Sequence, residues 1–324
     1  MLEKVFQPVI KEILKISPNR LIILDGLDYG EKPLLILKNR AIVQSTRGYQ
    51  PKSLVGWNSD NSRLPPPQWP MINLNRFLYG NSKKESQSPL EILGSIPAGK
   101  IIIHVSQVSA QANLKIHADG REIWSKKFSP GPGSGEWCEV IYQKEWNIYQ
   151  NRYDRDYEIQ LESKTKSIRI SVDEGDWLTF SWLKIIPSKK EEFKEVQLYA
   201  TNEDQNLKQS KIYLNKNGSI DSYRSSMFDR AWLTQKILPW QKLAESGTKV
   251  FIGEFGTMNT VPHDFTLAWM EDQLKNWQDV GWGWALWNFR GEHGIFDSNR
   301  KDVIYENYDG HKLDRKMLEL LQKY

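Results

Sequence analysis

Val250-Phe251-Ile252-Gly253-Glu254-Phe255-Gly256 is a short run of β-branched and aromatic residues that ends in a carboxylate between two glycines. Such a run predicts a parallel strand, because both faces of a parallel sheet are covered by helices and its strands are apolar throughout. A second strand-like run, Gly281 to Phe289, places Trp287 near its end. The carboxyl ends of parallel strands meet at one edge of a sheet, where ligands bind. We therefore expect Glu254 and Trp287 to share a site.

The segments around these two runs alternate between helical and strand-like patterns. Further buried strands are expected at Arg20 to Gly26 and at Ala41 to Thr46. Apolar residues at helical spacing predict helices at the following places: Met1 to Ile16, Pro33 to Asn39, Arg230 to Ser246, His263 to Val280 and Asp314 to Tyr324. This alternation indicates a parallel α/β fold. The four strands are half of those in a closed (β/α)8 barrel.

A middle segment, residues 88–187, has a different pattern. Short stretches of alternating apolar and polar residues are separated by glycine-rich turns such as Glu174-Gly175-Asp176. That pattern predicts a β-sandwich or jelly roll inserted into the α/β fold. The expected domains are therefore 1–87, 88–187 and 188–324. Two interpretations of the insert remain open: it binds carbohydrate, or it is structural and residues such as Trp177 and Trp182 fill its core.

Composition restricts the classes of function. The net charge of +4 comes from 44 basic and 40 acidic residues, a balance too mild and too mixed to favour nucleic acid. No apolar run is long enough for a membrane-spanning helix. The 14 Trp and 13 Tyr favour carbohydrate, since flat rings stack on sugars, although Trp also fills cores. Cys138, the sole cysteine, is expected to be a half-buried strand residue. The histidines are too scattered for a metal site, and no cofactor is expected.

The four strand segments, together with the stretch from Trp287 to Ser298, resemble the C-terminal half of glycoside hydrolase family 5, the cellulase-type (β/α)8 barrels. The resemblance covers about two-thirds of the chain and assigns the segments to barrel strands five to eight. It implies a retaining O-glycosyl hydrolase that cleaves a β-linked polysaccharide or oligosaccharide of the glucan or mannan class. It also implies a secreted protein.

The same resemblance assigns roles to individual residues. Glu254 is the expected nucleophile, and Tyr49 is the expected hydrogen-bond donor to it. Trp287 is the expected sugar platform. Apart from the resemblance, we expect Asn288, Arg47 and Trp57 to contact the substrate as well. Arg47 stands where the family usually has a histidine. The loop residues Trp57 and Trp69 could line the cleft or only fix a loop.

The second carboxylate of the family is missing. Its acid/base glutamate belongs to an Asn-Glu-Pro motif, which does not occur in this sequence. That motif would precede the first helix, so we expect a truncated chain. Asp25, Asp28 and Glu31 lie near the end of the first strand, but solvated loop positions are expected for them. The alternatives are a non-catalytic carbohydrate-binding protein and an inactive gene fragment.

Overall fold

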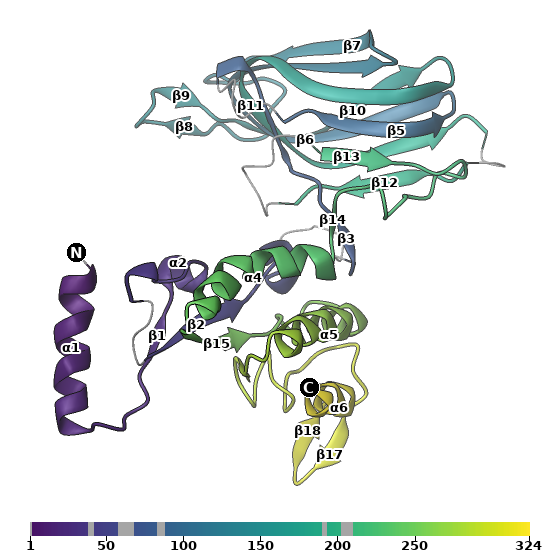
Figure 1. Ribbon diagram of the computed structural model, residues 1–324. Coiled ribbons are helices and arrows are strands. Elements are labelled where there is room, and N and C mark those ends of the chain that lie inside the picture. The colour runs from purple at the N-terminus through teal and green to yellow at the C-terminus, as the bar shows by residue number, and fades with distance from the viewer. Residues whose placement is uncertain (1, 38–41, 58–67, 83–87, 190–192, 202–209) are drawn as a thin grey trace. The chain divides into compact units, whose positions relative to one another are not determined.

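The structure is a computed structural model that describes residues 2–37, 42–57, 68–82, 88–189, 193–201 and 210–324 (Figure 1). It contains two compact units. The first combines Met1–Met71 with Phe228–Tyr324, and the second is Ile72–Met227. The second unit extends beyond the predicted insert of residues 88–187 on both sides, because strands outside those bounds pair with its sheet. In the described part of the chain, no helix is both long and apolar enough to span a membrane.

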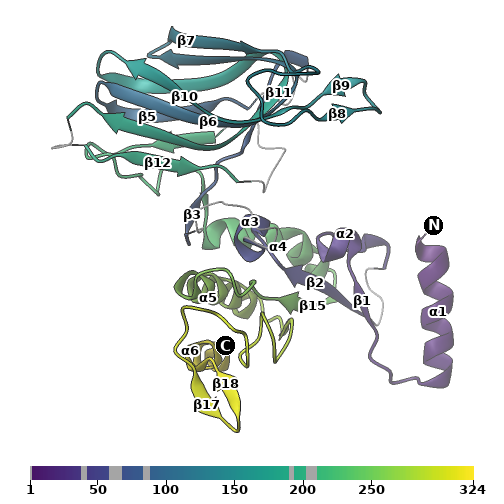
Figure 2. The same cartoon turned by 180° about the vertical axis from the view of Figure 1, so that it is seen from behind.

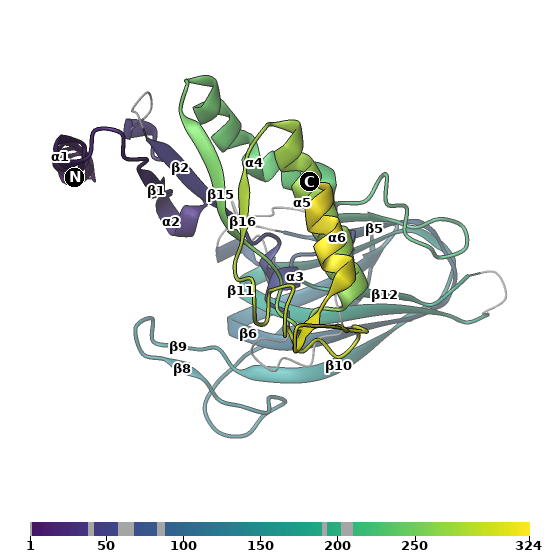
Figure 3. The ribbon, with the colours of Figure 1, turned by 90° about the horizontal axis from the view of Figure 1, so that it is seen from below.

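The first unit is built on a four-stranded sheet in the order β1-β2-β15-β16, in which all neighbours are parallel (Figure 3). Its strands are β1 (Ile23–Asp25), β2 (Val43–Gly48), β15 (Lys249–Phe255) and β16 (Trp284–Leu286). The predicted alternation of helices with parallel strands is therefore confirmed. The last strand is shorter than expected, and Trp287 lies just past its end. Closure of this sheet into a barrel stays a prediction.

Helices complete the first unit. The long ones are α1 (Leu2–Ile16), α4 (Arg230–Glu245), α5 (His263–Asp279) and α6 (Arg315–Lys323). The short elements are α2 (Leu27–Gly30), η1 (Leu35–Leu37), α3 (Lys52–Val55) and the hairpin β17 (Glu306–Tyr308) with β18 (His311–Leu313). The helix predicted at Pro33 to Asn39 is wrong: its described part holds only the 3₁₀ turn η1, and residues 38–41 lie outside the description.

The helix boundaries follow from capping and from apolar spacing. The Asp229 carboxylate accepts a hydrogen bond from the Trp232 amide and begins α4, and Asp314 does the same for α6. Apolar side chains of α1 pack beside β1 in a small cluster around Ile22 and Leu34 (Figure 2). The main core of the unit lies under α4 and α5, where Trp240, Trp269 and Trp277 are completely or almost completely buried. Part of the tryptophan content is therefore core rather than sugar platform.

The second unit contains one antiparallel sheet held by two long strands, β6 (Gly99–Ala118) and β11 (Thr165–Pro187). The other strands of this sheet are β4 (Phe77–Tyr79), β5 (Leu90–Ile96), β7 (Arg121–Phe128), β10 (Arg152–Leu161), β12 (Val196–Tyr199) and β13 (Ser210–Tyr213), the last of which pairs parallel to β5. Small two-stranded pieces are β8 (Tyr142–Gln143) with β9 (Ile148–Tyr149) and β3 (Met71–Ile72) with β14 (Met227–Phe228).

Two details of the predicted insert are wrong. The segment Glu174-Gly175-Asp176 is not a turn: the register of β11 against β6 shifts there, and Gly175 has φ +96°. A bulge lets the strand continue, so two predicted strands become one. Cys138 is exposed in a bend rather than half-buried in a strand. Both halves of β6 and β11 contribute to a single apolar core, as a sandwich requires, but the predicted sandwich or jelly-roll topology stays a prediction.

We predict that Gly48→Ala destabilises the first unit. An added Cβ would lie 2.7 Å from Trp277 Cζ2 and 2.9 Å from Phe255 Cβ, both in the buried core. Overpacking of this kind lowers the free energy of unfolding by about 1–3 kcal/mol. Urea unfolding measures it. Gly283→Ala is the matched control, since its Cβ would meet Phe251 at an ordinary 3.6 Å. Equal losses for the two variants would contradict the prediction.

Candidate functional site

Three charged side chains meet at the carboxyl ends of neighbouring strands. Asp25 ends β1, Arg47 lies near the end of β2, and Glu254 lies near the end of β15. Arg47 Nη2 is 2.9 Å from Asp25 Oδ2 and 3.3 Å from Glu254 Oε1. The Arg47 and Glu254 side chains are 26% and 25% exposed, so both remain accessible to a ligand.

A break in the strand register creates this arrangement. Ile252 pairs with Thr46, whereas Glu254 pairs with Arg47, so β15 carries one extra residue relative to β2 at Gly253. Such a bulge re-aims the side chain that follows it. A Cβ on residue 253 would lie 2.2 Å from Ser45 Oγ, so any larger residue here would require the Ser45 hydroxyl to rotate away. Gly253 therefore leaves room for the Ser45 side chain on the neighbouring strand.

Tyr49 lies just past β2, and its hydroxyl hydrogen-bonds the Glu254 carboxylate. Burial raises the pKa of Tyr49 far above its usual value, and the negative charge of Glu254 raises it further, while Arg47 acts in the opposite direction. The hydroxyl consequently keeps its proton and remains a donor to Glu254 across the physiological pH range. The structure thus brings together the expected nucleophile and its expected donor.

Trp287 follows β16 and is fixed to the end of β15, because its backbone N–H donates to the Phe255 carbonyl at 2.9 Å. Its side chain is 52% exposed. An exposed ring one strand away from Glu254 suits a stacking platform. Asn288 is less clearly placed at the site: its side-chain atoms approach Gly291 and Gly294, in the turn that follows.

The two loop tryptophans differ in their surroundings. Trp57 packs partly buried against the core of the first unit, and its carbonyl accepts a hydrogen bond from the Thr260 hydroxyl. Trp69 is buried, and its indole N–H donates to Asp272 on α5 at 3.0 Å. Trp69 is therefore a buried residue joined to α5. A role for Trp57 in substrate binding stays a prediction.

The structure adds His293 to the residues near the end of β15. Gly256 has φ +150°, and a Cβ at that position would lie 3.1 Å from His293 Nδ1. Burial lowers the pKa of His293, with a further contribution from Arg300. Gly256, two residues after Glu254, therefore leaves room for the His293 imidazole. The sequence carries no local signal for this contact, which joins two separate loops.

The other carboxylates near β1 face cations. Asp28 lies 2.6 Å from Lys32 Nζ, and Glu31 lies 2.8 Å from Lys52 Nζ. In the described part of the chain, no contact joins Asp28 or Glu31 to Glu254. Among the described residues there is also no cluster of three or more histidine, cysteine, aspartate or glutamate side chains that could hold a metal ion.

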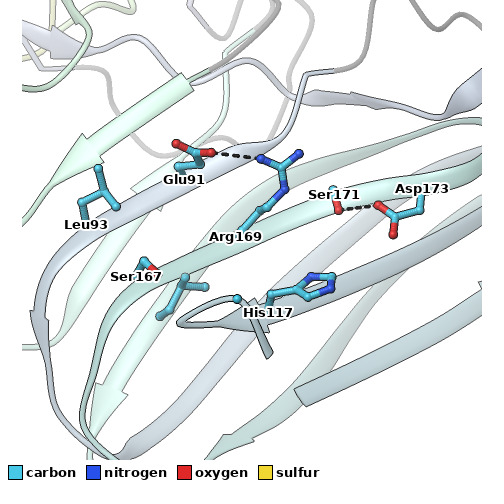
Figure 4. A pocket seen from close by; sticks show the side chains of 9 residues that line it. Glu91, Leu93, His117, Ser167, Arg169, Ser171 and Asp173 are labelled. Atoms are coloured by element: carbon cyan, nitrogen blue, oxygen red, sulfur yellow. Dashed lines mark hydrogen bonds and ion pairs between the residues drawn. The ribbon is translucent and has the colours of Figure 1, made fainter. Parts of the chain in front are cut away.

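The second unit carries an open trough of about 540 Å³ on the outer face of its sheet (Figure 4). Its polar groups neutralise one another: Arg169 pairs with Glu91 at 2.9 Å, and Ser171 donates to Asp173 at 2.7 Å. Among the described residues that line the trough, the imidazole of His117 is the one ring. Without a large aromatic platform, this trough is a weaker candidate for sugar than the strand ends of the first unit.

Among known proteins, the chain has a distant likeness to solved structures. No family model matches the chain, and no curated protein matches it. Among solved structures, the chain is similar to one described as a crystal structure of a glycoside hydrolase, with 19% sequence identity and a TM-score of 0.48. The match covers 99% of this chain and 52% of that chain, so this chain spans about half the length of the structure it matches. Assignment of the site rests on the geometry described above.

We predict that Glu254→Gln lowers the pKa of Tyr49 without returning it to its usual value. The substitution removes the negative charge that helps to keep the tyrosine protonated, while burial, the largest cause, remains. Ionisation of Tyr49 should therefore begin at lower pH in the variant than in the wild type. The ¹³Cζ signal of Tyr49, assigned with Tyr49→Phe, follows the titration. Identical titrations in both proteins would contradict the contact.

Proposed function

We propose that Glu254 is the nucleophile of a retaining β-glycoside hydrolase. One observation carries the proposal: a partly exposed carboxylate at the end of a parallel strand is held between a tyrosine hydroxyl and an arginine. In (β/α)8 enzymes, the carboxyl ends of the strands are where catalytic residues lie. The sequence resemblance to family 5 barrels supports the same residue and suggests a β-glucan or β-mannan substrate.

The proposed chemistry uses each neighbour of Glu254. The carboxylate attacks the anomeric carbon and forms a covalent glycosyl-enzyme intermediate, while the leaving oxygen departs with the aglycone. Tyr49 donates a hydrogen bond that orients the carboxylate, and Arg47 adds a fixed positive charge beside it. The exposed ring of Trp287 offers an apolar face on which a pyranose can stack. Water then cleaves the ester and releases the sugar.

A retaining hydrolase also needs an acid/base carboxylate about 5–5.5 Å from the nucleophile. General acid–base assistance contributes about 10²–10⁴-fold to the rate. Only the nucleophile is assigned in this chain. A decisive experiment therefore uses a substrate whose leaving group departs without a proton, so that the formation of the intermediate depends on Glu254 and not on an acid.

We expect 2,4-dinitrophenyl 2-deoxy-2-fluoro-β-glycosides to label this chain once, at Glu254. Dinitrophenolate leaves unprotonated, and the fluorine slows hydrolysis of the ester, so the intermediate accumulates. The glucoside, the mannoside and the cellobioside form the probe set. Intact mass spectrometry detects the added sugar, and peptide mapping places it.

The control variants separate a reacting residue from a damaged fold. Glu254→Gln should take up no label while it retains the wild-type melting curve. Tyr49→Phe should still be labelled at Glu254, but more slowly, because the carboxylate loses its orienting donor. Absence of label from a folded wild-type chain with all three probes, or label on another residue, would overturn the proposal.

A second candidate, carbohydrate binding without catalysis, is favoured by one feature of the second unit. In the hairpin formed by β8 and β9, Tyr142 is 48% exposed and Trp146 is 59% exposed. The Tyr142 hydroxyl donates to Asn147 at 2.6 Å, and the Trp146 amide donates to the Gln143 carbonyl, so the hairpin is locally fixed. Exposed rings on a fixed hairpin suit sugar stacking.

For this second candidate, we expect polysaccharide embedded in a native gel to retard the full chain, and Trp146→Ala to abolish most of the retardation. Tyr223→Ala is the matched control, since Tyr223 is an exposed aromatic residue of the same unit outside the hairpin. Soluble β-glucan and β-mannan are the polysaccharides to use. Free migration of the wild type in both would count against binding at this hairpin.

A further inference from the structure

Arg47 is shared between two carboxylates from opposite sides. Its neighbours are Asp25 on β1 and Glu254 on β15, and both approach the same terminal nitrogen, Nη2. The contact with Asp25 is the shorter one, 2.9 Å against 3.3 Å. The charges therefore alternate from negative to positive to negative across three adjacent strand ends. This arrangement makes the position of the guanidinium depend on Asp25.

The surroundings explain why Arg47 needs an anchor. An arginine side chain has several rotatable bonds, and holding it in one position costs conformational entropy. The Arg47 side chain is mostly buried, and its Nε atom is buried without a hydrogen-bond partner in the part of the chain that the structure describes. The strong hydrogen bonds of this guanidinium are thus concentrated at the end that faces Asp25 and Glu254. Charge-assisted bonds of that kind are roughly twice as strong as neutral ones.

We infer that Asp25 is a positioning residue for the glycosidase reaction, which acts on Glu254 through Arg47. The inference rests on the proposed function and deepens it. Asp25 holds the guanidinium where Nη2 meets Glu254 Oε1, and this contact fixes the direction of the nucleophile. In this inference Arg47 supports Glu254, whereas the sequence suggested a contact with sugar.

The geometry also separates Asp25 from the missing acid/base. An acid/base must reach the glycosidic oxygen, which lies between the two carboxylates of a retaining enzyme. Here Arg47 Nη2 stands between the two carboxylates, within hydrogen-bond distance of Asp25 and within ion-pair distance of Glu254. The Asp25 carboxylate is thus engaged by a cation rather than free to protonate a glycosidic oxygen. Asp25 consequently supports the nucleophile without contact with substrate.

The experiment is a double-mutant cycle on the rate of Glu254 labelling. The dinitrophenyl fluoroglycoside that labels the wild type gives a maximal inactivation rate and a concentration at half-maximal rate. Asp25→Asn should lower the maximal rate about tenfold, as expected for a weakened charge-assisted contact, and leave the half-maximal concentration unchanged. Arg47→Ala should lower it further. Adding Asp25→Asn to Arg47→Ala should produce no additional loss, because Asp25 acts only through Arg47.

Matched variants distinguish positioning from a general structural effect. Asp28→Asn removes a carboxylate from the same loop that pairs with Lys32 instead, and it should leave the labelling rate unchanged. Asp25→Glu keeps the charge and should recover part of the rate; it also replaces Asp25→Asn where that variant fails to fold. Trp287→Ala should show the opposite pattern, a higher half-maximal concentration with little change in the maximal rate.

The possible outcomes distinguish failure of the role inferred for Asp25 from failure of the proposed function. A wild-type rate for Asp25→Asn, or an equal further loss in the Arg47→Ala background, would overturn the inference while the labelling of Glu254 stands. Acceleration of Asp25→Asn turnover of dinitrophenyl glycosides by azide would also overturn it, since azide replaces a missing base. If the wild type is not labelled at all, the proposed function fails. The Tyr49 ¹³Cζ signal then decides: it should move in Asp25→Asn and not in Asp28→Asn, and an unmoved signal overturns the inference.

Discussion

The register between β2 and β15 is the constraint on which the candidate site depends. In a parallel sheet, a shift of one residue turns every following side chain to the opposite face. Here the shift is local and occurs at Gly253, between the pairs Ile252 with Thr46 and Glu254 with Arg47. The apolar residues before the bulge remain in the core, and the carboxylate after it meets a cation. The bulge at Gly253 therefore lets one strand contribute both to the core and to the candidate site.

The same strand ends also connect the site to the core. Gly48 ends β2 against Trp277 and Phe255, and Phe255 is completely buried directly after Glu254. Phe255 packs edge-on against Trp277, with ring centroids 4.9 Å apart. A rigid aromatic layer thus lies immediately beneath the carboxylate. Catalytic groups on such supported strand ends keep their geometry better than groups on free loops.

The sequence patterns predict most of the helices and strands, but they do not predict the side-chain contacts between them. The helices α4 and α5 were predictable almost to their ends, because their apolar spacing is regular and Asp229 caps the first of them. Glu254 and Tyr49 could be named because a strand end and a family resemblance point to them. The ion pairs of Arg47 were not predictable, since they depend on a bulge and on side-chain reach. In β11, Gly175 has the local composition of a turn, and only pairing with β6 shows that the strand continues.

The tryptophans show why composition alone could not locate a sugar site. Trp240, Trp269 and Trp277 lie on α4 and α5 at positions that face the sheet, and all three are buried. Trp287 follows a strand instead, where the chain leaves the sheet, and about half of its surface is exposed. All four residues are tryptophans, and whether each is buried or exposed depends on its position in a helix or after a strand. A count of aromatic residues therefore says little about ligands until each ring has been assigned to a helix face or a strand end.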